Sequence, residues 1–299
     1  MLKPAAALTD SGEPATPAPE GAPPALPESP LVTIEPGRSA GVSALRDLWH
    51  FRELLYFLVW RDLKVRYKQT ALGVAWVVMQ PLLTTVVFSV FLGLLARVPS
   101  DDAPYPVFVF AAMLPWTFFS GAVATSGNSL VGSSHLITKV YFPRVIIPMA
   151  AVGGRLVDFL VSFVVLALLM AFYRIAPTWN LLMLAPLVVL VTLLALAVGM
   201  WASASNVRYR DVAAILPVLV QLWMFASPVV YPVRIVPEEW RAVYSLNPLV
   251  GVIAGFRSAV LGQPFDWGAL GFSAGVTAAL LVVAALTFRR MEKHFADLV

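Results

Sequence analysis

The segment Trp60–Pro81 reads WRDLKVRYKQTALGVAWVVMQP. Its first part carries four cations, which are Arg61, Lys64, Arg66 and Lys68. From Ala71 the chain turns apolar, and no charged residue follows until Arg97. A basic cluster before an apolar run of this length is typical of the cytoplasmic entry to a transmembrane helix. We therefore predict that this segment begins the first membrane span and sets its orientation.

The composition extends this prediction to the whole chain. Of 299 residues, 59% are hydrophobic and 13% are charged, whereas soluble domains carry about 25% charged residues. The chain has no cysteine, which excludes disulfides and cysteine-ligated metal centres. We predict an all-α integral membrane protein whose transmembrane domain spans residues 44–299.

The N-terminal segment 1–43 differs from the rest. Nine of the 24 prolines lie in residues 1–36, and residues 1–43 carry a net charge of −3, against +7 for the remainder. Such a segment cannot bury enough apolar surface to offset the loss of chain entropy. We therefore predict a disordered, proline-rich cytoplasmic tail at 1–43.

A helical period follows over residues 44–60. Apolar and aromatic residues fall on one face of this helix, and Arg46, His50 and Glu53 fall on the other. This face contains Leu45, Leu48, Trp49, Leu55, Tyr56, Val59 and Leu63. Since Trp and Tyr favour the headgroup level, we predict an amphipathic helix at the membrane interface.

Six apolar segments are long enough to cross the membrane. They are Ala71–Ala96, Tyr105–Leu130, Ile146–Tyr173, Trp179–Ala204, Val212–Val233 and Trp267–Phe288. The apolar stretch Leu246–Leu261 is shorter and is interrupted by proline and glycine, so we predict short re-entrant helices before the last span.

The distribution of cations supports six spans with both termini cytoplasmic. With the N-terminus inside, eleven cations lie at inner ends and five at outer ends, as the positive-inside rule requires. The five outer cations are Arg97, Arg174, Arg234, Arg241 and Arg257.

Residues that could carry chemistry inside the membrane are few. Arg155 and Asp158 lie three positions apart in the third span, where they can pair on one helix face. A structural pair is favoured over a proton relay, because no second acid accompanies them. The nearest approach to a nucleotide-binding loop, GNSLVGSS at Gly127–Ser134, lacks the lysine that contacts phosphate. If this protein moves a substrate uphill, the energy must therefore come from a partner.

Aromatic side chains gather in the second and fifth spans. They are Trp116, Phe118, Phe119, Trp223, Phe225 and Tyr231. Two interpretations stay open: membrane-interface aromatics, or the lining of a passage in which flat rings stack on sugar rings.

Four stretches resemble the permease subunits of ABC transporters that export O-antigen, capsule and teichoic-acid polysaccharides in bacteria. They are WRDLKVRYKQTALGVAWVVMQP, Leu136–Pro148 (LITKVYFPRVIIP), Asn206–Val212 (NVRYRDV) and Tyr244–Arg257 (YSLNPLVGVIAGFR). They occur in the order of that family over about Leu45–Phe295.

This resemblance implies partners and a location. It implies a homodimer in the bacterial inner membrane with two separate ATPase subunits, which would bind ATP and Mg. The cargo would be a polysaccharide on undecaprenyl pyrophosphate or another lipid carrier. No catalytic residue, metal, cofactor or nucleic-acid contact is expected of this chain itself.

The resemblance also implies roles for particular residues. A coupling segment would dock into the ATPase through Lys139, Val140, Tyr141, Phe142, Pro143 and Arg144. The cations Arg61, Lys64, Arg66 and Lys68 would attract the pyrophosphate headgroup, and the six aromatics would line the channel.

Two other functions remain open. An exporter of a drug or small lipid would share the fold. A membrane-embedded glycosyl- or acyltransferase would require clustered acidic or histidine residues at a membrane-level cavity, whereas His50, His135 and His294 are scattered.

Overall fold

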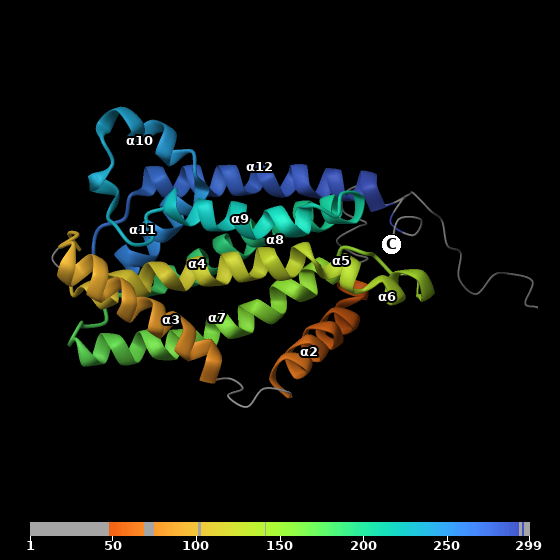
Figure 1. The fold of residues 1–299 in the computed structure, drawn as a ribbon, viewed down its shortest axis with the longest axis horizontal. Coiled ribbons are helices and arrows are strands. Elements are labelled where there is room, and N and C mark those ends of the chain that lie inside the picture. Colours follow the sequence, from red (N-terminus) through yellow and green to blue (C-terminus); the bar gives the residue numbers. More distant parts are fainter. Residues whose placement is uncertain (1–47, 69–74, 101–102, 141, 293–294, 296–299) are drawn as a thin grey trace, which may run out of the picture. The chain divides into compact units, whose positions relative to one another are not determined.

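The computed structural model describes residues 48–68, 75–100, 103–140, 142–292 and 295. All of them belong to one compact unit, Leu45–Val299. Every regular element in this part of the chain is helical (Figure 1), which confirms the predicted all-α class. The segment 1–43, predicted to be a disordered tail, lies outside the described residues.

Five helices are long and apolar enough to cross a membrane. They are Ala75–Leu95 (α3, Ala75–Phe88, continued by the π-helix η1, Ser89–Leu95), α4 (Tyr105–Gly127), α7 (Ile146–Phe172), Trp179–Arg208 (η2, Trp179–Met183, with α8, Leu184–Arg208) and α12 (Trp267–Glu292). Their lengths of 21 to 30 residues suit a hydrocarbon core of about 30 Å. They match five of the six predicted spans.

The remaining predicted span, Val212–Val233, is only partly helical. Helix α9 (Val212–Phe225) has 14 residues and is therefore about 21 Å long. It ends three residues before Pro228, and proline disfavours the helical conformation of the residue before it, although Pro217 lies inside α9. Side chains from other elements then bind the carbonyls of this irregular segment: Asn247 that of Ala226, and Tyr105 that of Val230.

Two short helices replace a straight crossing before the last span, as predicted. Helices α10 (Glu238–Ser245) and α11 (Pro248–Leu261) meet at an angle of 100°. Counted as one bent crossing, the pair raises the number of candidate spans from five to six. Asn247 caps α11 by accepting a hydrogen bond from the Leu249 N–H (3.1 Å), and α11 is buried along almost its whole length.

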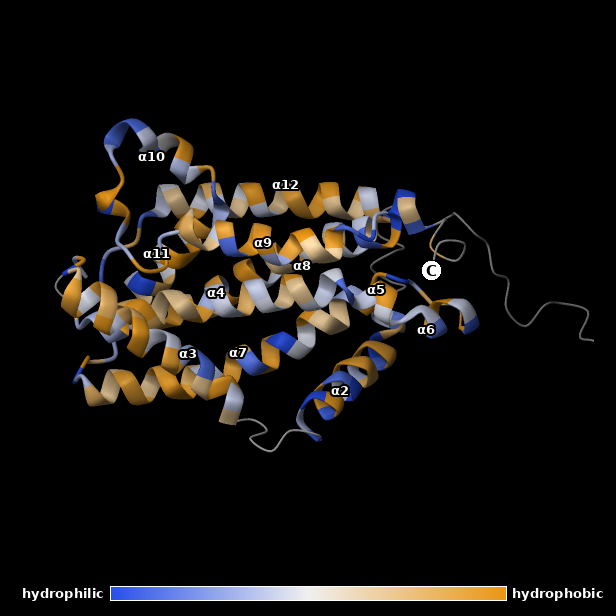
Figure 2. Ribbon diagram, in the orientation of Figure 1, coloured by the Kyte–Doolittle hydropathy of each residue, from blue (hydrophilic) through white to orange (hydrophobic). Residues whose placement is uncertain are grey.

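Helix α4 is the central element of the bundle. It packs against α7, α8, α3 and α11, and 78% of its most apolar window is buried within the chain. A helix that is apolar on all sides is expected to be covered on all sides. In Figure 2 the hydrophilic residues instead gather at the helix ends, on α2 (Arg52–Lys68) and α10, and in one stretch of α7.

A helix is present where the interfacial helix was predicted, and it extends further along the chain than predicted. Residues 48–50 are helical, and α2 continues eight residues beyond the predicted end at 60. Its leucine side packs against α7, with Leu58 buried. Trp49 and Tyr56, predicted on the same face, are 71% and 70% exposed. In that position they can lie at the headgroup level.

Candidate functional site

The four cations of α2 do not form one cluster. Arg61 pairs with its neighbour Asp62 (2.8 Å), and Lys64 lies 5.3 Å from the Trp60 ring. Lys68 is exposed in the last turn. Arg66 bonds to Asp158 of α7, and Arg61 lines a second, smaller cavity with Thr125 of α4 and Ala150 of α7, so the four predicted headgroup contacts have different surroundings.

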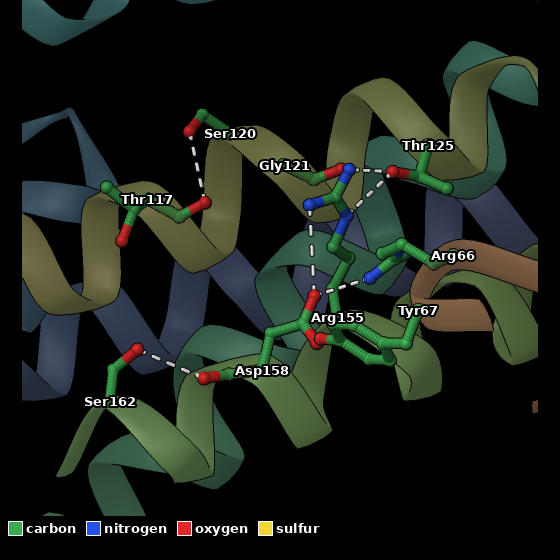
Figure 3. Close-up of polar contacts among 9 residues, drawn as sticks. All are labelled: Arg66, Tyr67, Thr117, Ser120, Gly121, Thr125, Arg155, Asp158 and Ser162. Atoms are coloured by element: carbon green, nitrogen blue, oxygen red, sulfur yellow. Dashed lines mark hydrogen bonds and ion pairs between the residues drawn. The ribbon is translucent and has the colours of Figure 1, made fainter. Parts of the chain in front are cut away.

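Asp158 is the junction between α2 and α7. Its carboxylate accepts hydrogen bonds from Arg66 and from the Tyr67 hydroxyl, both on α2, as Figure 3 shows for Arg66. On its own helix, Arg155 Nη1 lies 3.9 Å from Asp158 Oδ2. The predicted Arg155–Asp158 pair is therefore part of a larger cluster that joins the interfacial helix to a membrane span.

Arg155 lies deep in the chain's membrane region. It is nine residues into α7, or about 14 Å from the start of the helix. Its Nε donates to Thr125 Oγ1 on α4 (2.9 Å), and Thr125 donates to the Gly121 carbonyl (2.7 Å). The guanidinium lies beside Gly121 of α4, where an added Cβ would make an ordinary van der Waals contact at 3.6 Å. The Arg155 side chain is still 37% exposed.

That exposed part faces a cavity between α2, α3, α4 and α7. The cavity has a volume of about 640 Å³, and its charged lining residues are Arg66, Arg155 and Asp158. Its apolar wall includes Trp76, Phe118 and Phe159. Two cations and one anion thus face a space inside a largely apolar bundle, where uncompensated charge is costly. Among the described residues, no group of His, Asp or Glu forms a metal site.

Tyr67 stays protonated at neutral pH. Burial, and then its hydrogen bond to Asp158, raise the pKa of Tyr67 from 10.0 to about 12. The hydroxyl is therefore a permanent donor to the Asp158 carboxylate under ordinary conditions, and α2 reaches that carboxylate with two donors.

The predicted coupling segment is divided between surface and core. Helix α6 (Ser134–Lys139) ends where the segment begins, and Lys139 and Val140 are exposed. Phe142 is 5% exposed and packs with Leu58 and Ile146 inside the chain. This corrects its predicted role as a surface anchor, because its ring is already covered.

The other members of the coupling segment are fixed differently. Arg144 donates to the Glu292 carbonyl at the end of α12, and its backbone N–H donates to Glu292 Oε1 (3.0 Å). Pro143 is half-buried in the turn before α7. Tyr141 lies outside the described residues. The short helices α5 (Ser129–Gly132) and α6 carry the exposed part of this region.

The predicted channel aromatics of α4 are core residues. Trp116, Phe118 and Phe119 are 0–4% exposed. Phe118 stacks on Phe159 (4.7 Å), and Phe119 meets the edge of Trp223 (5.1 Å). Trp116 and Phe119 therefore line no passage in the chain, although Phe118 faces the cavity. The periodicity of the sequence could not predict which of these aromatics are buried, because α4 has no polar face that would indicate its orientation.

The aromatics that follow α4 in sequence lie near the junction of α10 and α11. Trp223 donates to Asn247 Oδ1 (3.0 Å), and the Tyr231 hydroxyl donates to the Phe225 carbonyl (2.9 Å). Phe225 itself is 61% exposed. Of the six predicted aromatics, it is the one that presents most of its ring outward.

One residue counted among the outer cations is a core residue. Arg257 on α11 is 5% exposed and donates to the carbonyls of Phe108 (3.3 Å), Val229 (2.8 Å) and Tyr231 (3.1 Å). Its guanidinium also lies 3.6 Å from the centre of the Phe108 ring. It fastens the irregular segment after α9 to α4.

Comparisons with known proteins agree with this architecture. The ABC-2 type transporter family matches residues 53–261. The chain is 32% identical over 260 residues to the O-antigen export system permease protein RfbA of Myxococcus xanthus, covering 86% of this chain and 99% of that protein. A protein of the same name from Klebsiella pneumoniae is 25% identical, covering 84% and 97%.

A third relative is less similar in sequence. The polysialic acid transport protein KpsM of Escherichia coli is 23% identical over 248 residues, covering 78% of this chain and 91% of that protein. The family match covers more than half of the chain, and its helices suit a protein that crosses the membrane several times. The chain is a multi-pass membrane protein that belongs to the ABC-2 type transporter family.

Proposed function

We propose that this chain is the permease subunit of an ATP-driven exporter of a lipid-linked cell-surface polysaccharide. The observation that carries the proposal is the near full-length similarity to an O-antigen export permease. The five long apolar helices fit a transport path, and the chain belongs to a family of transport subunits rather than enzymes.

The energy would come from two separate ATPase subunits that bind ATP and Mg. The chain has no sequence with the glycines and lysine of a P-loop. We propose that the ATPase docks on the surface that includes α6, Lys139 and Val140, with Tyr141 as a further predicted contact. The covered ring of Phe142 would support this surface from beneath.

A second copy of the chain would complete the channel. Only Leu216 and Val220 of α9 are buried within the chain, so most of this helix is free to face lipid or a partner. We propose that exposed aromatics such as Phe225 on α9 and Trp76 on α3 line the passage between two copies. The core rings of α4 would brace these helices.

The carrier headgroup would first meet the cations of α2. Arg61, Lys64, Arg66 and Lys68 lie in its last two turns, before the first span. Their joint replacement by glutamine should lower export while the complex with the ATPase still assembles. If export is unchanged, these cations serve only to set the orientation of the chain in the membrane.

The location proposed is the bacterial inner membrane with both termini cytoplasmic. Because the chain has no cysteine, a single introduced cysteine is the only thiol in it that a maleimide can label. Its labelling therefore shows on which side of the membrane that residue lies. Thr138→Cys on α6 should react with an impermeant maleimide only after permeabilisation, and Glu239→Cys on α10 should react in intact spheroplasts. The opposite labelling pattern would overturn the proposed orientation.

The function itself is tested by removing the gene and restoring it. Loss should remove the polysaccharide from the cell surface and leave the lipid-linked polymer inside, and the intact chain should restore export. The competing proposal, export of a drug or small lipid, predicts normal surface polysaccharide and ATPase stimulation by that smaller compound.

A further inference from the structure

The cavity between α2, α3, α4 and α7 has an imbalance of charge. Its charged lining residues are two arginines and one aspartate. Arg66 is already bonded to Asp158, which leaves Arg155 with a carboxylate at 3.9 Å, beyond hydrogen-bond distance. A cation in this position is unfavourable in an apolar bundle unless water or an anion accompanies it.

Most N–H donors of Arg155 are not used in hydrogen bonds among the described residues. Of its five N–H groups, one is used by Thr125. Within the described part of the chain, the others make no hydrogen bond, and the side chain is 37% exposed toward the cavity. The hydrogen bond from Nε to Thr125 Oγ1 (2.9 Å) and the contact beside Gly121 hold the guanidinium against α4. A pre-positioned planar fork of this kind matches phosphate oxygens.

We propose that this cavity binds the phosphate group of a polyprenyl-type lipid carrier, with Arg155 as the fixed ligand and Arg66 as a ligand shared with Asp158. The proposal rests on the proposed function and specifies where that substrate is held. Without the phosphate, Asp158 neutralises Arg66. A phosphate with a charge of about −1.5 to −2 at pH 7 would bridge both arginines and compete with the carboxylate.

The rest of the lining fits a lipid-linked phosphate better than a free one. Trp76 and Gln80 on α3 are exposed, so the cavity is open along this helix. Trp76, Pro81 and Phe118 offer an apolar wall next to the arginines. A chain of hydrocarbon attached to the phosphate would lie against this wall, whereas inorganic pyrophosphate would leave it uncovered.

Competition between the phosphate and Asp158 also connects binding to α2. Tyr67 and Arg66 are consecutive residues at the end of α2, and both bond to Asp158. When a phosphate takes Arg66, one of these two bonds is lost. Binding would therefore loosen the end of α2 where the chain leads toward the first span.

Binding to the purified full-length chain tests the site. Native mass spectrometry would titrate undecaprenyl phosphate, with undecaprenol and inorganic pyrophosphate as the two comparison probes. We expect Arg155→Gln to lower the affinity for undecaprenyl phosphate at least about tenfold, Arg155→Lys to lower it less, and Asp158→Asn to raise it by removing the competing carboxylate. Arg290→Gln, an exposed cation at the end of α12, is the matched control.

The outcomes separate the site from the function. Equal affinity of Arg155→Gln and the unaltered chain would overturn the site even if polysaccharide export is intact, and so would weaker binding by a folded Asp158→Asn. Equal binding of undecaprenol would overturn the role of the phosphate. Equal binding of inorganic pyrophosphate would overturn the lipid carrier as its source. If the unaltered chain exports no polysaccharide, the proposed function fails, whatever the binding result.

Discussion

Two arginines in the membrane bundle, Arg257 and Arg155, have opposite surroundings. Arg257 is 5% exposed, and three backbone carbonyls accept its hydrogen bonds. Arg155 makes one hydrogen bond to Thr125, has a loose ion pair and faces a cavity. The comparison teaches that the role of an intramembrane arginine depends on how its donors are used: the first holds the fold together, and the second can bind a ligand.

Replacement of Arg257 should have the largest effect on stability. Arg257→Gln would leave the carbonyls of Phe108, Val229 and Tyr231 short of donors inside the bundle. We expect the free energy of unfolding to fall by about 3–5 kcal/mol. In detergent, this would appear as a lower thermal midpoint or as loss of the peak of folded protein. Arg155→Gln should lower the free energy of unfolding by less than about 1 kcal/mol. A thermal midpoint for Arg257→Gln close to that of Arg155→Gln would break the comparison.

The contact between α11 and α12 should also be sensitive to close packing. A Cβ on Gly251 of α11 would lie 2.4 Å from the Ala269 carbonyl oxygen of α12, whereas a Cβ on Gly275 would meet nothing within 4 Å. Gly251→Ala should therefore cost about 1–3 kcal/mol. Gly275→Ala is the matched control and should raise the free energy of unfolding by up to about 1 kcal/mol, because alanine favours a helix interior more than glycine does. Equal thermal midpoints would contradict the tight α11–α12 contact.

The smallest expected effect is at the cavity and depends on pH. The pKa of Tyr67 is raised from 10.0 to about 12, so the stability that its hydroxyl contributes is fully present below pH 10 and is lost as pH rises through the higher value. Absorbance at 295 nm, compared with Tyr67→Phe, should show one tyrosine titrating near that higher pKa. A tyrosine that titrates at its ordinary value would contradict the contact with Asp158.

Much of this fold could be predicted from apolar runs and charge. Five of the spans begin or end within a few residues of their predicted positions, because a membrane requires about 20 apolar residues for each crossing. The exception, Val212–Val233, contains Pro217, which lies inside α9, and Pro228, which lies beyond its end, so the prolines alone did not indicate where the helix ends. Arg257 was placed outside because a residue count cannot show that a helix turns back into the bundle.

The candidate site was harder to predict, since its parts come from distant positions. The i,i+3 spacing indicated the pairing of Arg155 with Asp158, but Arg66 lies 92 residues from Asp158 in sequence. The aromatics of α4 were assigned to a passage, yet they pack in the core. The uniform apolarity of α4 was the one available signal that it would be covered on every side.

Export by the Arg155→Gln variant tests the central claim most directly. Cells that lack the native gene would produce the variant at the normal level together with its ATPase, and their surface polysaccharide would be measured by antibody binding. We predict that surface polysaccharide falls at least about tenfold while lipid-linked polymer accumulates inside, and that Arg290→Gln exports normally. Surface polysaccharide at the normal level in Arg155→Gln cells would contradict the account.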